Sequence, residues 1–490
     1  MSAPGAIEVQ GVLLAAAMAT ALGVVCLLEA HLRDRGPGGR PRPQGARWAG
    51  KRDLRELRIA SPEGGRLVLG RQGRRLIATV GQASVAVIGP SRISYKTTGF
   101  TIPAVLEWDG PVIATSTKSD LLLATIARRR ELGRVMVFDP TGATGMGNVN
   151  ATPLSGCGSW HGAMQVAHRL SSSARSGADG LQDSDFWHAA AEKLIAPLLF
   201  AAADSGGTMA DVIRWLNDGA EAEPEVRDLL VATGSVDAVS AWRANWNRDE
   251  RQRSSIYTTA ETALRAFADP RVLEATSRAD YTPADLLDGG ANTLYLCGPA
   301  HEQSRLASLF GSMVSEVVAM VFDLSASTGR PIEPALLMAL DEPANSAPIR
   351  ELDVIAATGA GQGVQLVGAV QDLAQMEARW GKRAATILNN FQATVFASGI
   401  SDPDTLRYVS AVVGEGEFRQ RSETAAEKGR GSSTEASAYR DLTPANVVRE
   451  GKPGTGVLIY GHRPPARIAL RPWFEDRNLK LLANGADDER

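Results

Sequence analysis

The sequence contains few cysteines and almost no net charge. Cys26, Cys157 and Cys297 are spread over 490 residues without a CxxC or Cys/His spacing. This pattern argues against a disulfide framework or a zinc site and favours a reducing compartment. The formal net charge of -3 leaves no global footprint for nucleic acid. Any DNA-facing surface must therefore be local.

The chain also lacks the composition of a disordered or a polytopic membrane protein. Hydrophobic residues make up 44% of the sequence and charged residues 22%. A disordered chain has a lower apolar content and a higher net charge. The slightly negative mean hydropathy excludes a polytopic membrane protein. The length indicates two or three domains with enough chain to bury a core.

A single long apolar run lies near the N-terminus. Val9–Leu28 carries no charged residue, and a helix of this length spans about 27–30 Å, close to one hydrocarbon thickness. Basic residues follow the run and none precedes it, so the positive-inside rule places the N-terminus outside and the bulk in the cytoplasm. A cleaved signal peptide fits poorly because a basic n-region is missing. The sequence predicts a single-pass anchor in the cell membrane, and a buried or surface helix is the alternative.

Hydrophobic periodicity divides the remainder into segments. We expect an α/β fold: a nucleotide-binding domain with a mainly parallel sheet, interrupted by an all-α domain that carries apolar residues at helical spacing. The predicted segments are a short extracytoplasmic N-terminus (1–8), a transmembrane helix (9–29), a basic Pro/Gly linker (30–54), the N-terminal segment of the nucleotide-binding domain (55–159), the all-α domain (160–283), the C-terminal segment of the nucleotide-binding domain (284–475) and a polar C-terminal tail (476–490).

Within the segment 55–159, residues 66–70 and 74–81 read as a hairpin, followed by a buried strand over 84–89. A helix over 120–132 lies between strands at 112–117 and 135–139, which indicates βαβ organisation. Three further features are predicted from composition. The Arg128–Arg130 run belongs to a solvated helix face, residues 420–440 form a flexible loop, and the chain contains no internal repeat.

The residues after the strand at 84–89 have some features of a phosphate-binding loop. Such a loop needs a Lys that reaches the phosphate oxygens and a Ser or Thr that holds Mg²⁺, and Lys96 and Thr97 provide both. The two glycine positions hold Pro90 and Tyr95 instead. A strand-to-helix turn with no ligand is therefore the alternative. The candidate loop comprises Pro90, Ser91, Arg92, Ile93, Ser94, Tyr95, Lys96, Thr97 and Thr98.

Two further strand ends carry polar groups that suit nucleotide chemistry. The apolar run 334–340 ends in Asp341 and Glu342, where an Asp can hold the Mg²⁺ shell and a Glu can polarise water. Gln371 ends the strand predicted over 364–371, where an amide can sense the terminal phosphate or orient water. Taken alone, an apolar strand followed by Asp-Glu and a surface Gln are also common structural features.

The residues around these groups resemble a known family. The matching blocks include IGPSRISYKTTGF (88–100), LLMALDEPANSAPI (336–349) and LVGAVQDLAQMEARWG (366–381). The chain resembles the TraG/TraD-like type IV secretion coupling ATPases of conjugative systems, in a form associated with actinobacteria. The resemblance covers roughly 55–475, and it is most specific around Asp341–Glu342 and Gln371–Gln375.

The resemblance implies a RecA-like P-loop motor on a membrane anchor. It implies a homo-hexamer that uses ATP and Mg²⁺ to feed single-stranded DNA, with its attached relaxase, into a type IV secretion channel. Thr97 and Asp341 would hold the Mg²⁺ that accompanies the nucleotide. Glu342 and Gln371 would be the catalytic residues. The same resemblance assigns Lys96 to the phosphates.

Two departures from the family pattern keep other functions open. Tyr95 replaces the glycine before the lysine, and Ala360 stands where many relatives carry an arginine that can act on a neighbouring subunit's site. Arg379 or Arg407 could substitute for that arginine. One alternative is a non-hydrolysing membrane docking protein with a degenerate site. Another is an FtsK-like DNA pump, which fits the all-α insertion less well.

Overall fold

The structure is a computed structural model that describes residues 45–116, 118–175, 182–424 and 432–485. The chain divides into two compact units. The larger contains the described residues of 48–413 and 443–490, and the smaller contains those of 1–47 and 414–442. The transmembrane helix predicted over 9–29 lies outside the described residues.

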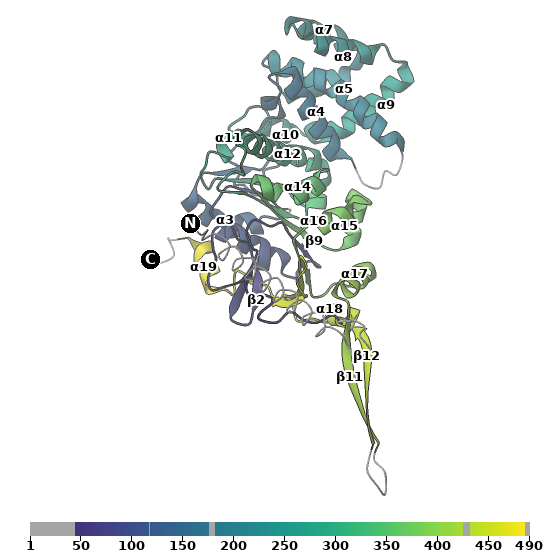
Figure 1. Cartoon of the computed structure of the whole chain (residues 1–490). Coiled ribbons are helices and arrows are strands. Elements are labelled where there is room, and N and C mark those ends of the chain that lie inside the picture. Colours follow the sequence, from purple (N-terminus) through teal and green to yellow (C-terminus); the bar gives the residue numbers. More distant parts are fainter. Residues whose placement is uncertain (1–44, 117, 176–181, 425–431, 486–490) are drawn as a thin grey trace, which may run out of the picture. The chain divides into compact units, whose positions relative to one another are not determined.

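A twelve-stranded sheet forms the centre of the larger unit (Figure 1). Its strands are β1 (Arg58–Ile59), β2 (Val68–Gln72), β3 (Arg75–Ala78), β4 (Val85–Ile88), β5 (Val112–Ser116), β6 (Val135–Phe138), β7 (Thr293–Cys297), β8 (Leu336–Asp341), β9 (Val364–Val370), β10 (Ala393–Ala397), β13 (Thr455–Tyr460) and β14 (Ala466–Ala469).

The strand order is β1-β3-β2-β14-β13-β10-β4-β9-β8-β5-β7-β6. Every pairing from β10 to β6 is parallel, and every pairing from β1 to β10 is antiparallel. The parallel strands β4 to β9 are buried at every residue, which is typical of a sheet covered on both faces. The predicted hairpin before β4 and the βαβ organisation after it are confirmed.

Helices α2 (Ile102–Glu107), α3 (Asp120–Leu132) and α19 (Arg477–Asn484) contact one another in the larger unit. The prediction of a polar C-terminal tail over 476–490 is wrong for α19, because its Leu479 is fully buried. The amphipathic spacing of Leu479 and Ala483 in an otherwise polar segment gives this helix one apolar side. β14, in which two of the four residues are exposed, is a strand that the sequence did not indicate.

The longest described helix, α12 (Gln303–Thr328), is long and apolar enough to cross a membrane by composition alone. Most of its apolar window is nevertheless buried inside the protein. Its neighbours include α4 (Trp160–Ala174) and α13 (Pro343–Ser346). We therefore assign α12 to the core of the fold.

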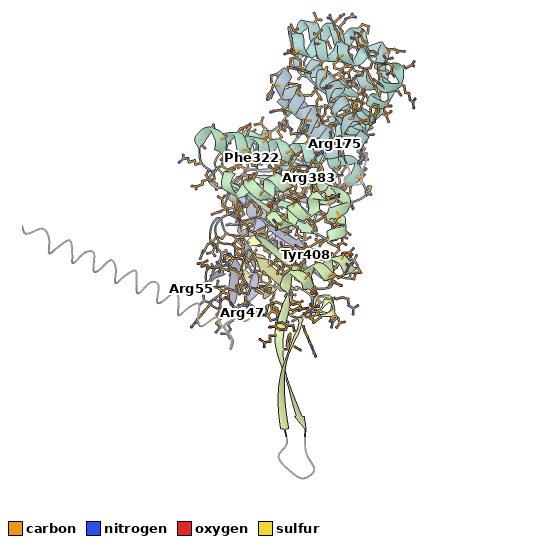
Figure 2. All side chains as sticks on the ribbon, turned by 45° about the vertical axis from the view of Figure 1, so that its right-hand side comes forward. Arg47, Arg55, Arg175, Phe322, Arg383 and Tyr408 are labelled. Carbon is orange, nitrogen blue, oxygen red and sulfur yellow. The ribbon has the colours of Figure 1, made fainter. Side chains whose placement is uncertain are left out.

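The described elements between β6 and β7 are all helices. Its α-helices after α4 are α5 (Gln182–Asp204), α6 (Met209–Asp218), α7 (Glu223–Ala232), α8 (Val236–Trp246), α9 (Glu250–Leu264), α10 (Pro270–Ala275) and α11 (Pro283–Leu286). α5 contacts α4, α8 and α9, and Figure 1 shows these helices gathered together. Arg175, labelled in Figure 2, follows α4 and pairs with Asp185 of α5 at 2.8 Å. The helical spacing read from the sequence here matches the structure.

The prediction of a solvated arginine run is wrong for Arg129, which is fully buried. Its guanidinium donates to the Trp108 carbonyl at 2.5 Å, to the Gly110 carbonyl at 2.7 Å and to the Ala291 carbonyl at 2.8 Å. Its Nε also donates to the Thr293 hydroxyl at 2.6 Å. Arg129 thus joins α3 to the segments that precede β5 and β7, which a sequence of three consecutive arginines does not reveal.

In the smaller unit, the loop predicted over 420–440 is wrong for most of its residues. β11 (Glu415–Thr424) and β12 (Ser432–Asp441) form an antiparallel two-stranded ribbon. Such a ribbon is built from backbone hydrogen bonds between its strands, so it can form without the apolar content that the prediction required. The Ala46 amide donates to the Glu415 carbonyl at 2.7 Å beside the base of this ribbon.

Candidate nucleotide site

The candidate residues lie at the carboxyl ends of three adjacent parallel strands. The order β4-β9-β8 places the loop after β4, Gln371 after β9, and Asp341–Glu342 at the end of β8 side by side. Ligands of open α/β sheets bind at this edge. Residues far apart in the sequence are thus brought together by strand order.

The loop after β4 folds back on its own start. The Ser94 hydroxyl donates to the Pro90 carbonyl at 2.6 Å, and the Ile93 amide donates to the Ser91 carbonyl at 3.0 Å. Gly89 starts the loop, and a β-carbon there would lie 2.7 Å from that of Ser94. Ser91, Arg92 and Ile93 are exposed at the turn. The loop therefore forms a compact turn although it lacks both expected glycines.

Two residues of this loop adopt left-handed backbone conformations that normally favour glycine. Arg92 has a φ of 73° and Tyr95 a φ of 56°. Each such residue costs about 1–2 kcal/mol for an L-amino acid with a β-carbon. Tyr95 therefore adopts a backbone conformation that glycine adopts freely, at the cost of added strain.

Lys96 precedes a helical turn, η1 (Thr97–Thr101), that also contains Thr98 and leads into α2. The Lys96 ammonium is buried and lies 3.3 Å from Glu342 Oε1. The Gln371 side-chain amide donates to the same Glu342 oxygen at 3.2 Å. Glu342 Oε1 therefore contacts both Lys96 and Gln371, so that three residues predicted separately from the sequence lie together.

Thr97 and Asp341 form the second contact across the site. The Thr97 hydroxyl lies 3.0 Å and 3.1 Å from the two carboxylate oxygens of Asp341. Asp341 is buried, with 4% of its surface exposed. A hydroxyl and a carboxylate in contact present the oxygen ligands that Mg²⁺ prefers.

The electrostatics of the two carboxyl groups differ. Burial raises the pKa of Asp341 to about 7, against the opposing effects of Lys96 and Thr97. For Glu342, burial also acts to raise the pKa, but the Lys96 charge and the hydrogen bond from Gln371 outweigh it and leave the pKa below its usual value. Only one ammonium faces these two carboxylates within the described residues of the site. A bound divalent cation would supply the positive charge that the buried Asp341 lacks.

Two residues support the site without having been assigned a role from the sequence. The Gln375 side chain accepts a hydrogen bond from the Gln371 backbone amide at 2.9 Å, at the start of α15 (Leu373–Trp380). The Ser346 hydroxyl donates to the Asp341 carbonyl at 2.9 Å. The four-residue spacing of Gln371 and Gln375 was the available signal for the first contact. The second is a tertiary contact that no local pattern marks.

Neither substitute arginine lies free beside these groups. The Arg379 guanidinium donates to the Ser173 carbonyl at 2.7 Å, and Arg407 pairs with Asp404. Arg407 precedes Tyr408, labelled in Figure 2, on α17 (Pro403–Val413). Ala360 lies in a short helical turn, η5 (Gly359–Gln362). The candidate site in one chain is therefore built from Lys96, Thr97, Asp341, Glu342 and Gln371.

The chain is similar in sequence to conjugal transfer proteins. Conjugal transfer protein TraG of Agrobacterium fabrum is 24% identical over 409 residues, which is 79% of this chain and 60% of that protein. Protein VirD4 of the same organism is 24% identical over 459 residues, covering 89% of this chain and 66% of that protein. The chain thus spans about 60% of the TraG relative's length.

A solved structure shares the fold. Plasmid coupling protein TrwB, in complex with ADP and Mg²⁺, superposes with a TM-score of 0.65 at 16% identity, covering 89% of this chain and 97% of that chain. The family described as Type IV secretory system Conjugative DNA transfer matches residues 50–487. With nearly all of the larger unit inside that match, the chain belongs to the type IV secretory system conjugative DNA transfer family.

Proposed function

We propose that this chain is an ATP-driven coupling protein that delivers single-stranded DNA, with its attached relaxase, to a type IV secretion channel. The observation that carries the proposal is the meeting of Lys96 and Thr97 with Asp341 and Glu342 at one sheet edge. Family membership and the conjugal transfer proteins among its relatives support the same activity.

The proposed cofactors are ATP and Mg²⁺. The loop from Pro90 to Thr98 would surround the phosphates, with the Lys96 ammonium moving from Glu342 to the terminal phosphate oxygens. Thr97 and Asp341 would hold Mg²⁺, which neutralises phosphate charge when bound. The TrwB structure with ADP and Mg²⁺ supports this assignment by analogy of fold.

Glu342 and Gln371 are the proposed catalytic pair. Because Lys96 leaves Glu342 when it binds phosphate, the carboxylate becomes available to accept a proton from the attacking water. Gln371 donates to Glu342 at 3.2 Å, and this contact supports a role for its amide in orienting water next to the same carboxylate.

The assembly and the domains also belong to the proposal. We propose a homo-hexamer anchored in the cell membrane by residues 9–29, with the bulk in the cytoplasm. Segments 55–159 and 284–475 would form one nucleotide-binding domain, and 160–283 would form the all-α domain that selects substrate. Binding of the DNA backbone would be electrostatic and independent of sequence, and hence strongly dependent on salt.

The test is hydrolysis of ATP by the full-length protein in detergent or nanodiscs, with and without single-stranded DNA. The proposal expects DNA-stimulated turnover that Lys96→Ala abolishes. Lys118→Ala is the matched control, because Lys118 is an exposed lysine near the end of β5. Equal background turnover in the wild type and in Lys96→Ala would contradict the proposal.

A non-hydrolysing docking protein is the second candidate. It is favoured by Ala360, which removes the usual arginine, and by the strained Tyr95. It predicts that the protein binds the DNA–protein cargo and that Glu342→Gln changes nothing. The hydrolysis assay separates the two functions.

A further inference from the structure

Tyr95 faces a glycine from a distant region of the sequence. Gly454 precedes β13 and has a φ of 74°. A β-carbon built on Gly454 would lie 2.6 Å from Cδ2 and 3.0 Å from Cε2 of the Tyr95 ring. These separations are too short for any real side chain. The ring of Tyr95 therefore occupies the space that a side chain at position 454 would need.

Gly454 is hydrogen-bonded to the loop that follows β4 and also packs against it. Its amide donates to the carbonyl of Ile93 at 3.3 Å, within the loop itself. Its carbonyl accepts from the amide of Leu470 at 2.7 Å. These two hydrogen bonds hold the Gly454 backbone in contact with the loop.

Two other contacts hold the tyrosine. Its ring meets the Phe474 ring edge to face at 6.2 Å between centroids. Its carbonyl accepts from the Gly99 amide at 2.6 Å, and a β-carbon on Gly99 would lie 3.1 Å from Cβ of Tyr95. The half-buried side chain is bordered by the turn that follows Lys96 and by two segments near the C-terminus.

We propose that Tyr95 and Gly454 are a positioning pair that holds the phosphate loop in its binding conformation. A glycine before the lysine gives a loop that can reach the left-handed conformation freely and must be ordered when phosphate binds. Here the tyrosine ring, seated on Gly454, fixes that conformation before phosphate arrives. This inference rests on the proposed function, because it assumes that the loop binds a nucleotide.

If Tyr95 and Gly454 act as a pair, substitutions at the two positions should have coupled effects on nucleotide binding. A side chain at position 454 would push on the Tyr95 ring. Through the ring it would displace the backbone of Tyr95, which directly precedes Lys96. In the Tyr95→Gly background the same replacement no longer meets the ring, and the strain of its positive φ remains. Residues in contact show such non-additivity, whereas independent sites do not.

The experiment is a double-mutant cycle on the full-length protein with a fluorescent ATP analogue and Mg²⁺. The variants are Tyr95→Gly, Gly454→Ala and the double variant, with Tyr95→Phe as the conservative change. Gly461→Ala is the matched control, because Gly461 also has a positive φ, of 50°, and a β-carbon there would meet nothing within 4 Å. Thermal unfolding is measured for every variant.

We expect Gly454→Ala to weaken nucleotide binding about tenfold in the wild-type background and less than about twofold in the Tyr95→Gly background. In the Tyr95→Phe background, Gly454→Ala should still weaken binding about tenfold, because the contacts with Gly454 involve ring carbons only. Gly461→Ala should lower the melting temperature through backbone strain and leave affinity unchanged.

The outcomes separate the two proposals. If the wild type binds nucleotide and Gly454→Ala has the same effect in both backgrounds, the positioning pair is wrong and the proposed function stands. If Gly461→Ala weakens binding as much as Gly454→Ala does, the effect reflects stability alone and the pair is again wrong. A folded wild type that binds no nucleotide overturns both the pair and the proposed function.

Discussion

Replacement of Glu342 by glutamine tests the catalytic assignment with the least disturbance to the structure. Glu342 Oε1 accepts from the Lys96 ammonium at 3.3 Å and from the Gln371 amide at 3.2 Å. A glutamine has the same size, and its amide oxygen can accept both hydrogen bonds. The change therefore removes the negative charge and the ability to accept a proton while it keeps the geometry.

The expected change in kcat is much larger than the expected change in nucleotide affinity. A positioned general base contributes about 10²–10⁴-fold to a rate, so kcat for ATP should fall by that factor. Binding should change by less than about threefold, because Lys96, Thr97 and Asp341 make the proposed ground-state contacts and all three remain. Loss of kcat without loss of affinity marks an interaction that matters only in the transition state.

The assay is single-turnover hydrolysis of radiolabelled ATP by the full-length protein with single-stranded DNA, alongside equilibrium binding of the same nucleotide. Glu351→Gln is the control, since Glu351 is a partly buried acid that precedes α14 (Leu352–Thr358) outside the site. Hydrolysis at the wild-type rate by Glu342→Gln would refute the assignment of Glu342 as the base.

Two further predictions concern the fold. Arg129→Met should lower the free energy of unfolding by about 3–5 kcal/mol in chemical denaturation, because it leaves buried carbonyls unpaired. Arg128→Ala, which loses one exposed bond to Glu131, should cost less than about 1 kcal/mol, and equal losses would contradict this reading. Burial raises the pKa of the Cys157 and Cys297 thiols to about 12. Peptide mass spectrometry should therefore find neither thiol alkylated in the native protein at pH 8 and both alkylated after denaturation; native labelling of either would disprove its burial.

The parallel half of the sheet could be predicted from sequence because its strands are uninterrupted apolar runs. Such runs are needed wherever both faces of a sheet are covered, and helix α3 between β5 and β6 completed the pattern. The strand ends then indicated Asp341, Glu342 and Gln371 as site residues. Strand order, which sequence does not encode locally, was what placed them beside Lys96.

Other features depend on contacts between distant segments and could not be predicted. Arg129 looks like its two neighbours in sequence, and only the carbonyls around it explain its burial. The ribbon of β11 and β12 is stabilised by backbone pairing between its strands, which leaves no apolar signal to read. Tyr95 indicated a defective loop because its compensating partner, Gly454, is far away in the sequence.

We propose that a loop without its usual glycines still presents Lys96 and Thr97 to a nucleotide opposite Asp341. Isothermal titration calorimetry of Mg²⁺-ATP into the full-length protein tests it directly. We expect saturable binding that requires Mg²⁺, and its loss in Lys96→Ala with folding unchanged. Absence of binding to the folded wild type, or equal affinity in Lys96→Ala, would contradict it.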